Sequence, residues 1–429
     1  MMTVIKGGRV IDPGKLDDIL DIVIKGGYIV EIKQDALAGN EDKKSKVIDA
    51  SGKIVAPGLI DMHVHLRDPG YEYKETIETG GRAAAYGGFT AICCMPNTNP
   101  VNDCRQVTEY IIKKAVKAGT VRVYPVAAIS KGLKGDSLCE YGELKEVGAI
   151  AVSDDGNPVM NSQLMRKALE YSSGFNLPVI SHCEDLDLVS GGAMNEGAVA
   201  TKMGISGIPN AAETIMVLRD IALCELTGIP VHIAHVSTKE SVRAIRDAKK
   251  RGVPVTAETA PHYFMLTDAS IIDYNTNYKM NPPLRTEEDR VAICQGLADG
   301  TIDAIATDHA PHSIIEKAVE FDQAANGIIG LETSVSLGLK LVEAGIIDIT
   351  NLIEKMSKNP ARILGLKTGL EIGKTADITI IDPEISFCID DDRFQSLSRN
   401  TPFDGWDVKG KAVLTMVGGK IVFRDEHFV

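Results

Sequence analysis

A repeated strand–helix pattern constrains this chain more than any other feature of its sequence. From Leu59 to Thr307, short apolar runs rich in Val, Ile and Ala alternate with stretches whose apolar residues recur every three to four positions. Such alternation predicts β-strands separated by α-helices. Helices are expected, for example, over Asp103–Ala118 and Ser237–Arg251. The candidate strands are Gly58–His63, Gly88–Cys94, Val121–Ala127, Ala149–Ser153, Pro178–His182, Pro230–His235, Pro254–Glu258 and Ile302–Thr307. Eight such units predict an α/β fold, a (β/α)8 TIM-like barrel.

The segments outside this repeat have a different hydrophobic pattern, which predicts a second, smaller domain. Val4–Ile11, Asp21–Ile32 and Lys46–Val55 are short strand-like runs separated by Gly and Asp turns, and the tail from Ala376 resumes the pattern. A chain of 429 residues also exceeds the usual size of one compact core. We predict a β-sandwich built from residues 1–57 and 368–429, with the barrel in 58–367. The alternative is that the two ends form separate hairpins on the barrel.

Composition excludes several classes of partner. The 59 acidic and 46 basic residues give a formal charge of −13, and no basic run could follow a nucleic-acid backbone. No charged start followed by a long apolar stretch indicates a signal or membrane segment, so we expect a cytoplasmic protein. Its eight cysteines include no CxxC pair and lie mostly in apolar patterns, as expected of reduced packing residues.

Metal-ligating side chains follow five of the predicted strands. His63 and His65 end the first strand, and because strand side chains alternate, both imidazoles point to the same side. The other strands end in Asp154-Asp155, His182, His235 and Asp308. Each alone has a structural explanation, such as a turn, a buried histidine or a helix cap. Their convergence at the carboxyl ends of barrel strands, where active sites lie, favours a functional site.

Four histidines and two carboxylates exceed one tetrahedral zinc site and suit two metal ions that share a bridging carboxylate and hydroxide. The metals would lower the pKa of the bridging water and polarise a carbonyl, while Asp308 would shuttle a proton. His232 precedes His235 by three positions, so it faces the opposite way in a strand. We interpret His232 as a packing residue.

These residues and their neighbours resemble a known family. Residues 57–70 (PGLIDMHVHLRDPG), Met95-Pro-Asn-Thr98, Ser153-Asp-Asp-Gly156, His182-Cys-Glu-Asp185 and Thr307-Asp-His-Ala-Pro-His312 together look like a dihydroorotase of the amidohydrolase superfamily. The resemblance spans nearly the whole chain. It implies a barrel with a β-sandwich, two zinc ions, and the reversible ring closure of N-carbamoyl-L-aspartate to L-dihydroorotate in pyrimidine synthesis.

The resemblance also implies the metal ligands. They are His63, His65, Asp155, His182, His235 and Asp308. Asp155 is favoured because the family's bridging aspartate directly precedes the glycine, whereas strand alternation alone leaves Asp154 open. Many relatives bridge their metals with a carboxylated lysine at the end of strand four. This sequence has no lysine there, so it looks like the subset that bridges with aspartate.

Substrate contacts are implied in the same way. They match His65, Arg67, Asn97, Asn281 and His312, together with the backbone at Asn326-Gly327. A guanidinium suits a carboxylate and the asparagines suit ring amides. Asn326 stands where relatives usually have a large apolar residue, and Ile314-Ile315 replaces a more acidic stretch. A Gly-rich connection, Ser190–Pro209, has little helical pattern and is expected to be a mobile loop over the site.

Two other readings remain open. A hydantoinase or allantoinase shares the HxH start and the barrel, but those relatives use the lysine bridge, so Arg67 and the spacing from Asp308 to His312 favour dihydroorotase. A non-catalytic homologue could act as a scaffold for aspartate transcarbamoylase, but such a homologue is expected to have lost ligands. The resemblance also leaves room for aspartate transcarbamoylase as a partner of an active enzyme and for a homo-oligomer.

Overall fold

The computed structural model describes residues 2–36 and 46–428 and contains the predicted barrel. Eight parallel strands, one from each predicted run, pair in the order β6-β7-β8-β9-β10-β13-β14-β15. The fold class is therefore confirmed. The strands are β6 (Leu59–Val64), β7 (Phe89–Cys94), β8 (Arg122–Ala127), β9 (Ala151–Ser153), β10 (Val179–Ser181), β13 (Val231–Ile233), β14 (Val255–Thr259) and β15 (Ala304–Ile305).

The barrel closes between its first and last strands through a few specific contacts. A parallel bridge joins Val64 to His309, and the His65 N–H donates to the His309 carbonyl at 2.8 Å. Below this bridge, both carboxylate oxygens of Asp61 accept from the Thr307 N–H at 3.2 Å. Burial raises the pKa of Asp61 to about 7. This closure sets the ends of β6 and β15 side by side, so His63, His65 and Asp308 share one part of the rim.

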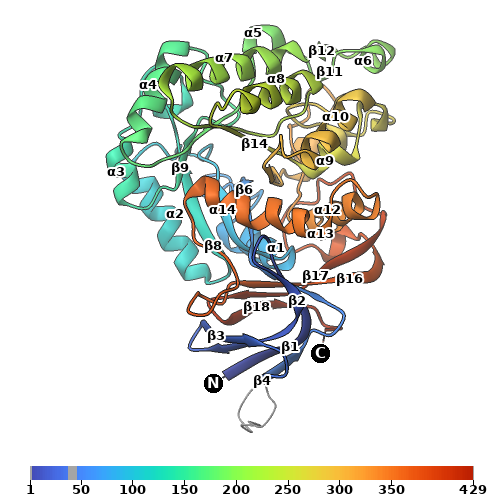
Figure 1. The fold of residues 1–429 in the computed structure, drawn as a ribbon. Helices are drawn as coiled ribbons and strands as arrows, with labels where there is room; N and C mark the ends of the chain where they lie inside the picture. Colours follow the sequence, from blue (N-terminus) through green and yellow to red (C-terminus); the bar gives the residue numbers. More distant parts are fainter. Residues whose placement is uncertain (1, 37–45, 429) are drawn as a thin grey trace.

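Helices form the outer layer of the barrel (Figure 1). Two of them begin at threonine caps: the Thr238 side chain accepts a hydrogen bond from the Ser241 N–H at the start of α8, and the Thr286 side chain accepts one from the Asp289 N–H at the start of α10. No helix in the described part of the chain is long and apolar enough to cross a membrane. The helices are α1 (Ile77–Tyr86), α2 (Arg105–Ala118), α3 (Tyr141–Glu146), α4 (Ser162–Ser173), α5 (Leu186–Val189), α6 (Ala198–Met203), α7 (Ala211–Thr227), α8 (Lys239–Lys250), α9 (Pro261–Met265), α10 (Glu287–Ala298), α11 (Ile314–Lys317), α12 (Ser334–Glu343), α13 (Ile349–Ile353) and α14 (Asn359–Leu364).

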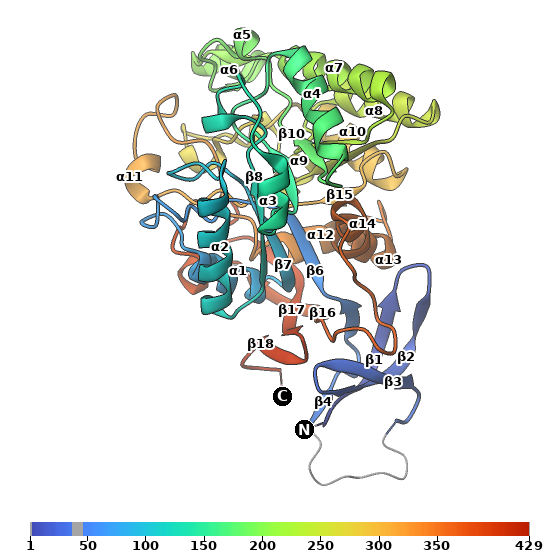
Figure 2. The same ribbon diagram turned by 90° about the vertical axis from the view of Figure 1, so that its left-hand side faces the viewer.

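The two ends of the chain build one mixed sheet with its own apolar core. Its path is β18-β17-β16-β5-β1-β2-β3, with β4 paired to β1, so the antiparallel pair β5–β16 joins the N-terminal strands to the C-terminal ones. The alternative of two separate hairpins was wrong. The sheet lies at one end of the barrel, and both termini lie there (Figures 1 and 2). Its strands are β1 (Met2–Asp12), β2 (Leu16–Lys25), β3 (Tyr28–Lys33), β4 (Lys46–Asp49), β5 (Ile54–Pro57), β16 (Ile378–Cys388), β17 (Asp407–Val417) and β18 (Lys420–Arg424).

We propose domain boundaries at 57/58 and 367/368. Strand β5 ends at Pro57 and β6 begins at Leu59, so the chain passes directly from the terminal sheet into the barrel. At the other end, α14 finishes at Leu364 and β16 begins at Ile378. Residues 37–45 of the N-terminal segment lie outside the described residues.

Three local expectations were wrong. The run Lys46–Val55 is divided between β4 and β5 by a turn that includes Gly52, whose φ angle is 73°. The run Asp21–Ile32 is divided between β2 and β3, because Gly26 and Gly27 turn the chain with φ angles of 61° and 86° that favour glycine. The connection Ser190–Pro209 is not irregular, because a parallel pair of short strands, β11 (Met194–Asn195) and β12 (Gly207–Ile208), flanks α6. Its mobility stays a prediction. Periodicity cannot reveal strands of two residues, which is why this segment looked irregular.

The cysteines largely behave as predicted. All eight are free thiols, and six of them are buried. The other two are Cys104, which is half-buried, and Cys388, which is exposed on β16.

Candidate metal centre and substrate site

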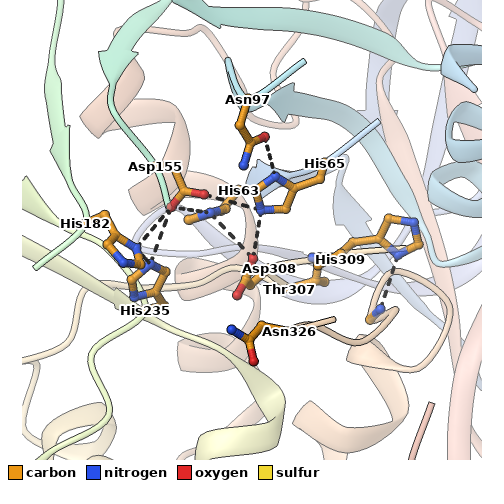
Figure 3. A network of polar contacts seen from close by, with 12 residues as sticks. His63, His65, Asn97, Asp155, His182, His235, Thr307, Asp308, His309 and Asn326 are labelled. Atoms are coloured by element: carbon orange, nitrogen blue, oxygen red, sulfur yellow. Dashed lines mark hydrogen bonds and ion pairs between the residues drawn. The ribbon is translucent and has the colours of Figure 1, made fainter. Parts of the chain in front are cut away.

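The six predicted metal ligands meet at the carboxyl ends of the barrel strands (Figure 3). His63 lies in β6 and His65 directly follows that strand, while the others come from the residues just after β9, β10 and β13 and from the loop after β15. Each is at least 92% buried, which is unusual for histidine and aspartate. The ligands are His63, His65, Asp155, His182, His235 and Asp308.

Asp155 lies at the centre of this cluster. Its Oδ1 is 3.2 Å from His63 Nε2, 3.5 Å from His182 Nδ1 and 3.4 Å from His235 Nε2. Its Oδ2 is 3.5 Å from His65 Nε2. One carboxylate thus faces all four imidazoles, three with one oxygen and the fourth with the other. A carboxylate with histidines around both of its oxygens can be shared by two metal ions that those histidines hold.

Asp308 is the second carboxylate in contact with His63 and His65. Its Oδ1 is 3.1 Å from His65 Nε2 and 3.6 Å from His63 Nε2. Two groups of three atoms lie close enough to hold an ion: His63 with Asp155 and His235, and His63 with His65 and Asp308. His182 belongs to neither group, although its Nδ1 is 2.7 Å from His235 Nε2.

The neighbouring aspartate, Asp154, has a different role. Its Oδ1 accepts hydrogen bonds from the backbone N–H groups of Ile129 and Ser130 at 2.7 and 3.0 Å, and its Oδ2 accepts from the Ser130 hydroxyl. Asp154 therefore fixes the loop after β8, and its oxygens are occupied. Of the two candidates, Asp155 is the one whose carboxylate faces the histidines.

The residues present fit divalent metal ions. Buried polar atoms normally have hydrogen-bond partners, yet His63 Nε2 and Asp155 Oδ1 have none. Burial alone would raise the pKa of Asp155, but the surrounding histidines, His63 foremost, hold it well below its usual range. Imidazole nitrogens and carboxylate oxygens are the ligands found in zinc sites of hydrolases. A metal ion would satisfy these atoms.

Two buried glutamates that the sequence did not single out orient the histidines from behind. Glu258 Oε1 lies 2.7 Å from His63 Nδ1. Glu184 Oε2 lies 3.1 Å from His182 Nε2, while its other oxygen accepts from Asn281 Nδ2 at 3.0 Å. Such partners fix the tautomer and the ring direction of metal-binding histidines. The sequence did contain an indication of both residues, since Glu184 lies within the motif His182-Cys-Glu-Asp185 and Glu258 ends the seventh predicted strand.

His232 is buried, as a packing residue would be, but it also belongs to this outer layer. Its Nδ1 is 2.8 Å from Thr256 Oγ1, and its Nε2 is 3.3 Å from Glu258 Oε2. Burial would raise the pKa of Glu258, but hydrogen bonds with His232 and His63 lower it to about 2. A charged Glu258 thus links His232 to His63.

Three of the predicted site residues have backbone conformations that non-glycine residues rarely adopt. Arg67, His235 and Asp308 have φ angles of 60°, 33° and 49°. Such strain persists only where the surrounding structure enforces it, and it concentrates at functional sites. Each residue follows a barrel strand, so the left-handed turn redirects its side chain at the rim.

The predicted substrate contacts surround this cluster, but some of their groups are engaged. Asn97 Oδ1 accepts from His65 Nδ1 at 2.8 Å, so Asn97 also orients one of the predicted metal ligands. Asn281 uses its amide nitrogen on Glu184, while its buried Oδ1 has no partner. The Gly327 N–H donates to the Lys279 carbonyl at 3.0 Å. Asn326 lies beside Asp308 (Figure 3).

Arg67 and His312 form a cationic corner next to the cluster. Arg67 is 91% buried; its Nε donates to the Pro311 carbonyl at 3.1 Å, and its Nη2 is 3.2 Å from His312 Nε2. His312 Nε2 donates its proton to the Asn326 carbonyl at 2.8 Å, so its approach to Arg67 Nη2 is a contact between two donors. Burial and the nearby cations, Arg67 first among them, lower the pKa of His312 to about 2. His312 is therefore neutral, and the positive charge of this corner is carried by Arg67.

Solved structures with the same fold indicate the class of protein. L-Hydantoinase (dihydropyrimidinase) from Arthrobacter aurescens is 26% identical, with a TM-score of 0.89 over 100% of this chain and 97% of that one. D-Hydantoinase (dihydropyrimidinase) from Thermus sp. is 27% identical, with a TM-score of 0.81 over 100% and 96% of the two chains. The barrel, the terminal sheet and the histidine–aspartate cluster make this chain a hydrolase of the cyclic amidohydrolase class, with a small-molecule substrate.

Curated relatives narrow the class to one family. Dihydroorotases from Desulforapulum autotrophicum and Geobacter metallireducens are each 58% identical over 99% of this chain and 100% of their own length. The dihydroorotase from Acetivibrio thermocellus is 56% identical over 98% and 99% of the two chains. The family described as dihydro-orotase-like matches residues 52–241. The chain belongs to the dihydroorotase family.

Proposed function

We propose that this chain catalyses the reversible cyclisation of N-carbamoyl-L-aspartate to L-dihydroorotate with loss of water, in pyrimidine synthesis. Its family membership supports the reaction, and one structural observation supports the substrate. Among residues 2–36 and 46–428, no carboxylate forms an ion pair with the buried Arg67 guanidinium beside the metal-ligand cluster. A buried cation without a partner is costly unless an anion reaches it.

The substrate supplies such an anion. Dihydroorotate carries a carboxylate on a ring carbon that one methylene group separates from the carbonyl carbon of the amide bond that breaks. With this carboxylate on Arg67, the ring amide would lie over the cluster next to Asp155 and Asp308. Neutral rings such as hydantoin and dihydrouracil lack the carboxylate and would leave Arg67 unpaired.

We further propose two zinc ions as the cofactor, held by His63, His65, Asp155, His182, His235 and Asp308. Bound there, they would supply an activated water and polarise the scissile carbonyl. Asp155 would serve as the shared carboxylate, which its contacts with all four histidines support. Glu258 and Glu184 would hold His63 and His182 in the required ring orientation.

Asp308 would move the proton. In the hydrolytic direction it would take a proton from the attacking water on its carboxylate and deliver it to the departing ring nitrogen. In ring closure the same carboxylate would accept the proton from the ureido nitrogen. Its place at the edge of the cluster, in contact with His65 and beside Asn326, supports this role.

The remaining proposals concern the cell. Eight free thiols suit a reducing cytoplasm. Homo-oligomerisation and a partnership with aspartate transcarbamoylase stay proposals that the family resemblance motivates. Gel filtration with light scattering, alone and with a purified transcarbamoylase, would test both.

One substrate panel tests the function. The purified protein is assayed with dihydroorotate, N-carbamoylaspartate, dihydrouracil and hydantoin, with added zinc and after removal of metal by a chelator. Dihydroorotate should be turned over with a kcat/KM at least about 100-fold above the neutral rings, which is about 2.7 kcal/mol of transition-state discrimination. Chelation should abolish the activity. A preference for hydantoin or dihydrouracil would favour the hydantoinase alternative, and turnover of none of them would favour the scaffold alternative.

A further inference from the structure

A buried lysine beside the proposed substrate site has no acidic partner. Lys317, the last residue of α11, is 95% buried. Its Nζ donates to three backbone carbonyls: Ala325 at 2.8 Å, Gly327 at 3.1 Å and Lys279 at 3.2 Å. Within the described residues, no carboxylate lies within ion-pair distance of this ammonium. All three of its protons are thus used to hold main chain.

A buried ammonium without a counter-ion is expensive, so packing alone does not explain this residue. Burial, followed by the charge of Lys279, lowers the pKa of Lys317 to about 7. Lys279 is itself buried and donates to the carbonyls of Asp322 and Ala324 at 2.8 and 2.7 Å. Two lysines therefore fix one loop through its carbonyl groups, where an apolar side chain would pack at less cost.

The carbonyls bound by Lys317 flank a single residue, Asn326. Ala325 and Gly327 precede and follow it, and both bind the same ammonium. The carbonyl of Asn326 itself accepts from His312 Nε2 at 2.8 Å, and Asn400 Nδ2 also donates to the Gly327 carbonyl at 3.0 Å. The side chain left free by this arrangement is that of Asn326, which lies beside Asp308 at the edge of the cluster (Figure 3).

We propose that Lys317 is a positioning residue that clamps the backbone on both sides of Asn326 and so directs the Asn326 amide to the substrate. An amide that both donates and accepts suits the ureido and imide groups of the substrate ring. The inference rests on the proposed function for the identity of the ligand, but the clamp itself does not depend on it.

The matched control is Lys355. It is 94% buried, and its Nζ donates to the Ile302 carbonyl at 2.8 Å, at the end of the barrel opposite the cluster. Lys355→Met removes a buried ammonium of the same kind without touching the proposed substrate site. Any effect shared by Lys317→Met and Lys355→Met reports general stability, and an effect confined to Lys317→Met reports the clamp.

The first measurement needs no substrate. Hydrogen exchange of the backbone amides in residues 321–328 should be at least about tenfold faster in Lys317→Met than in the wild type, because this variant loses the hydrogen bonds from Nζ to the loop carbonyls. Exchange in Lys355→Met should be unchanged. Equal exchange in the wild type and Lys317→Met would overturn the clamp. This result stands whatever the wild type does with dihydroorotate, so it separates failure of the inference from failure of the proposed function.

The second measurement is a double-mutant cycle on the KM for dihydroorotate. Asn326→Ala and Lys317→Met should each raise KM about tenfold with kcat within about threefold, and the double variant should be no worse than either, because both changes remove the same contact. Lys317→Arg, which keeps charge and donors, should restore part of the affinity. Multiplicative effects in the double variant, or a wild-type KM in Asn326→Ala, would overturn the inference even if Lys317→Met failed to fold.

Discussion

At the scale of single residues, the two adjacent aspartates after β9 offer the sharpest contrast in the molecule. Asp155 faces the histidines and Asp154 faces a loop backbone. Asp155→Ala should lose at least one of two bound metals and nearly all activity, and activity of the wild type should not depend on bicarbonate, since no lysine would need carboxylation. Asp154→Asn should keep its metals while losing stability. Elemental analysis of the two variants checks this, and full metal retention in Asp155→Ala would contradict the assignment.

The proton-transfer role of Asp308 predicts a different signature. Asp308→Asn keeps the shape of the side chain and an oxygen that can face a metal, but it removes the group that carries the proton. The kcat should fall about 10²- to 10⁴-fold, the usual range for losing general acid–base catalysis. Metal content should be measured on the same preparation. A variant with both metals and a rate near that of the wild type would assign the proton transfer to another residue.

Substitutions of Arg67 test whether its guanidinium recognises the carboxylate of the substrate. Arg67→Met should bind metal normally but lose at least about 30-fold in kcat/KM for dihydroorotate, equal to about 2 kcal/mol, because the substrate carboxylate would then be buried without a partner. Arg67→Lys should recover only part of the loss, since an ammonium cannot reproduce the planar fork. Neutral rings provide the internal control, because their slow turnover should change little. An Arg67→Met variant as active as the wild type would disprove the substrate assignment.

The site residues that lie in recognisable sequence motifs could be predicted. The residues that orient those side chains or their backbone from elsewhere in the chain could not. His63, His65 and Asp308 follow strands at the rim, so periodicity and a barrel prediction suffice to bring them together. Glu258 orients His63 from 195 positions away, and the carbonyl cage of Lys317 depends on where a loop folds back. Local pattern contains no information on such contacts, because they are set by side-chain direction within the folded barrel.

At the scale of elements, one arginine binds both short strands of the segment Ser190–Pro209. Arg285 Nη1 donates to Asn195 Oδ1 at 3.1 Å and to the Ile208 carbonyl at 2.8 Å, one contact on each of the paired strands β11 and β12. Asn195 Nδ2 in turn donates to Asp268 Oδ2 at 3.0 Å. No local sequence pattern predicts this anchor, because the two strands are too short to show an alternating pattern and Arg285 lies far along the chain.

Removing this anchor should loosen the segment. Arg285→Met should increase the rate of limited proteolysis within residues 190–209 by about tenfold, because the strands would lose both side-chain contacts while the barrel core stays intact. Arg290→Met is a control on the neighbouring helix α10, since the Arg290 guanidinium contacts Glu287 and the Phe264 carbonyl and does not touch the segment. Cleavage of both variants at the wild-type rate would show that Arg285 is not the anchor. Protection of the wild type by saturating dihydroorotate would in addition support ordering of this segment by substrate.

At the scale of the whole molecule, the terminal sheet is joined to the barrel where the barrel strands begin. The hydroxyl of Thr379, on β16, donates to the Gly88 carbonyl at 2.6 Å and accepts from the Leu59 N–H at 3.3 Å. A side chain on Gly88 would meet Thr379 and Ala412 at 2.9 and 2.8 Å, so the two units are in close contact. The strand pattern predicted the terminal sheet and the barrel. It could not predict how they are joined, because the contacts of Thr379 with Gly88 and Leu59 form only in the tertiary structure.

This joint predicts that the two units unfold together. Thr379→Val keeps the shape of the fully buried side chain but leaves the Gly88 carbonyl without this donor, which should cost about 1–3 kcal/mol of unfolding free energy. Trp406, the one tryptophan, lies next to β17 and reports unfolding of the C-terminal segment by fluorescence, while loss of activity reports the barrel. In denaturant both curves should coincide in the wild type and shift together in Thr379→Val, whereas Thr3→Val on β1 should shift neither. A variant whose Trp406 transition moved while the activity transition stayed in place would show that the terminal sheet and the barrel are independent units, and that the joint at Thr379 does not couple them.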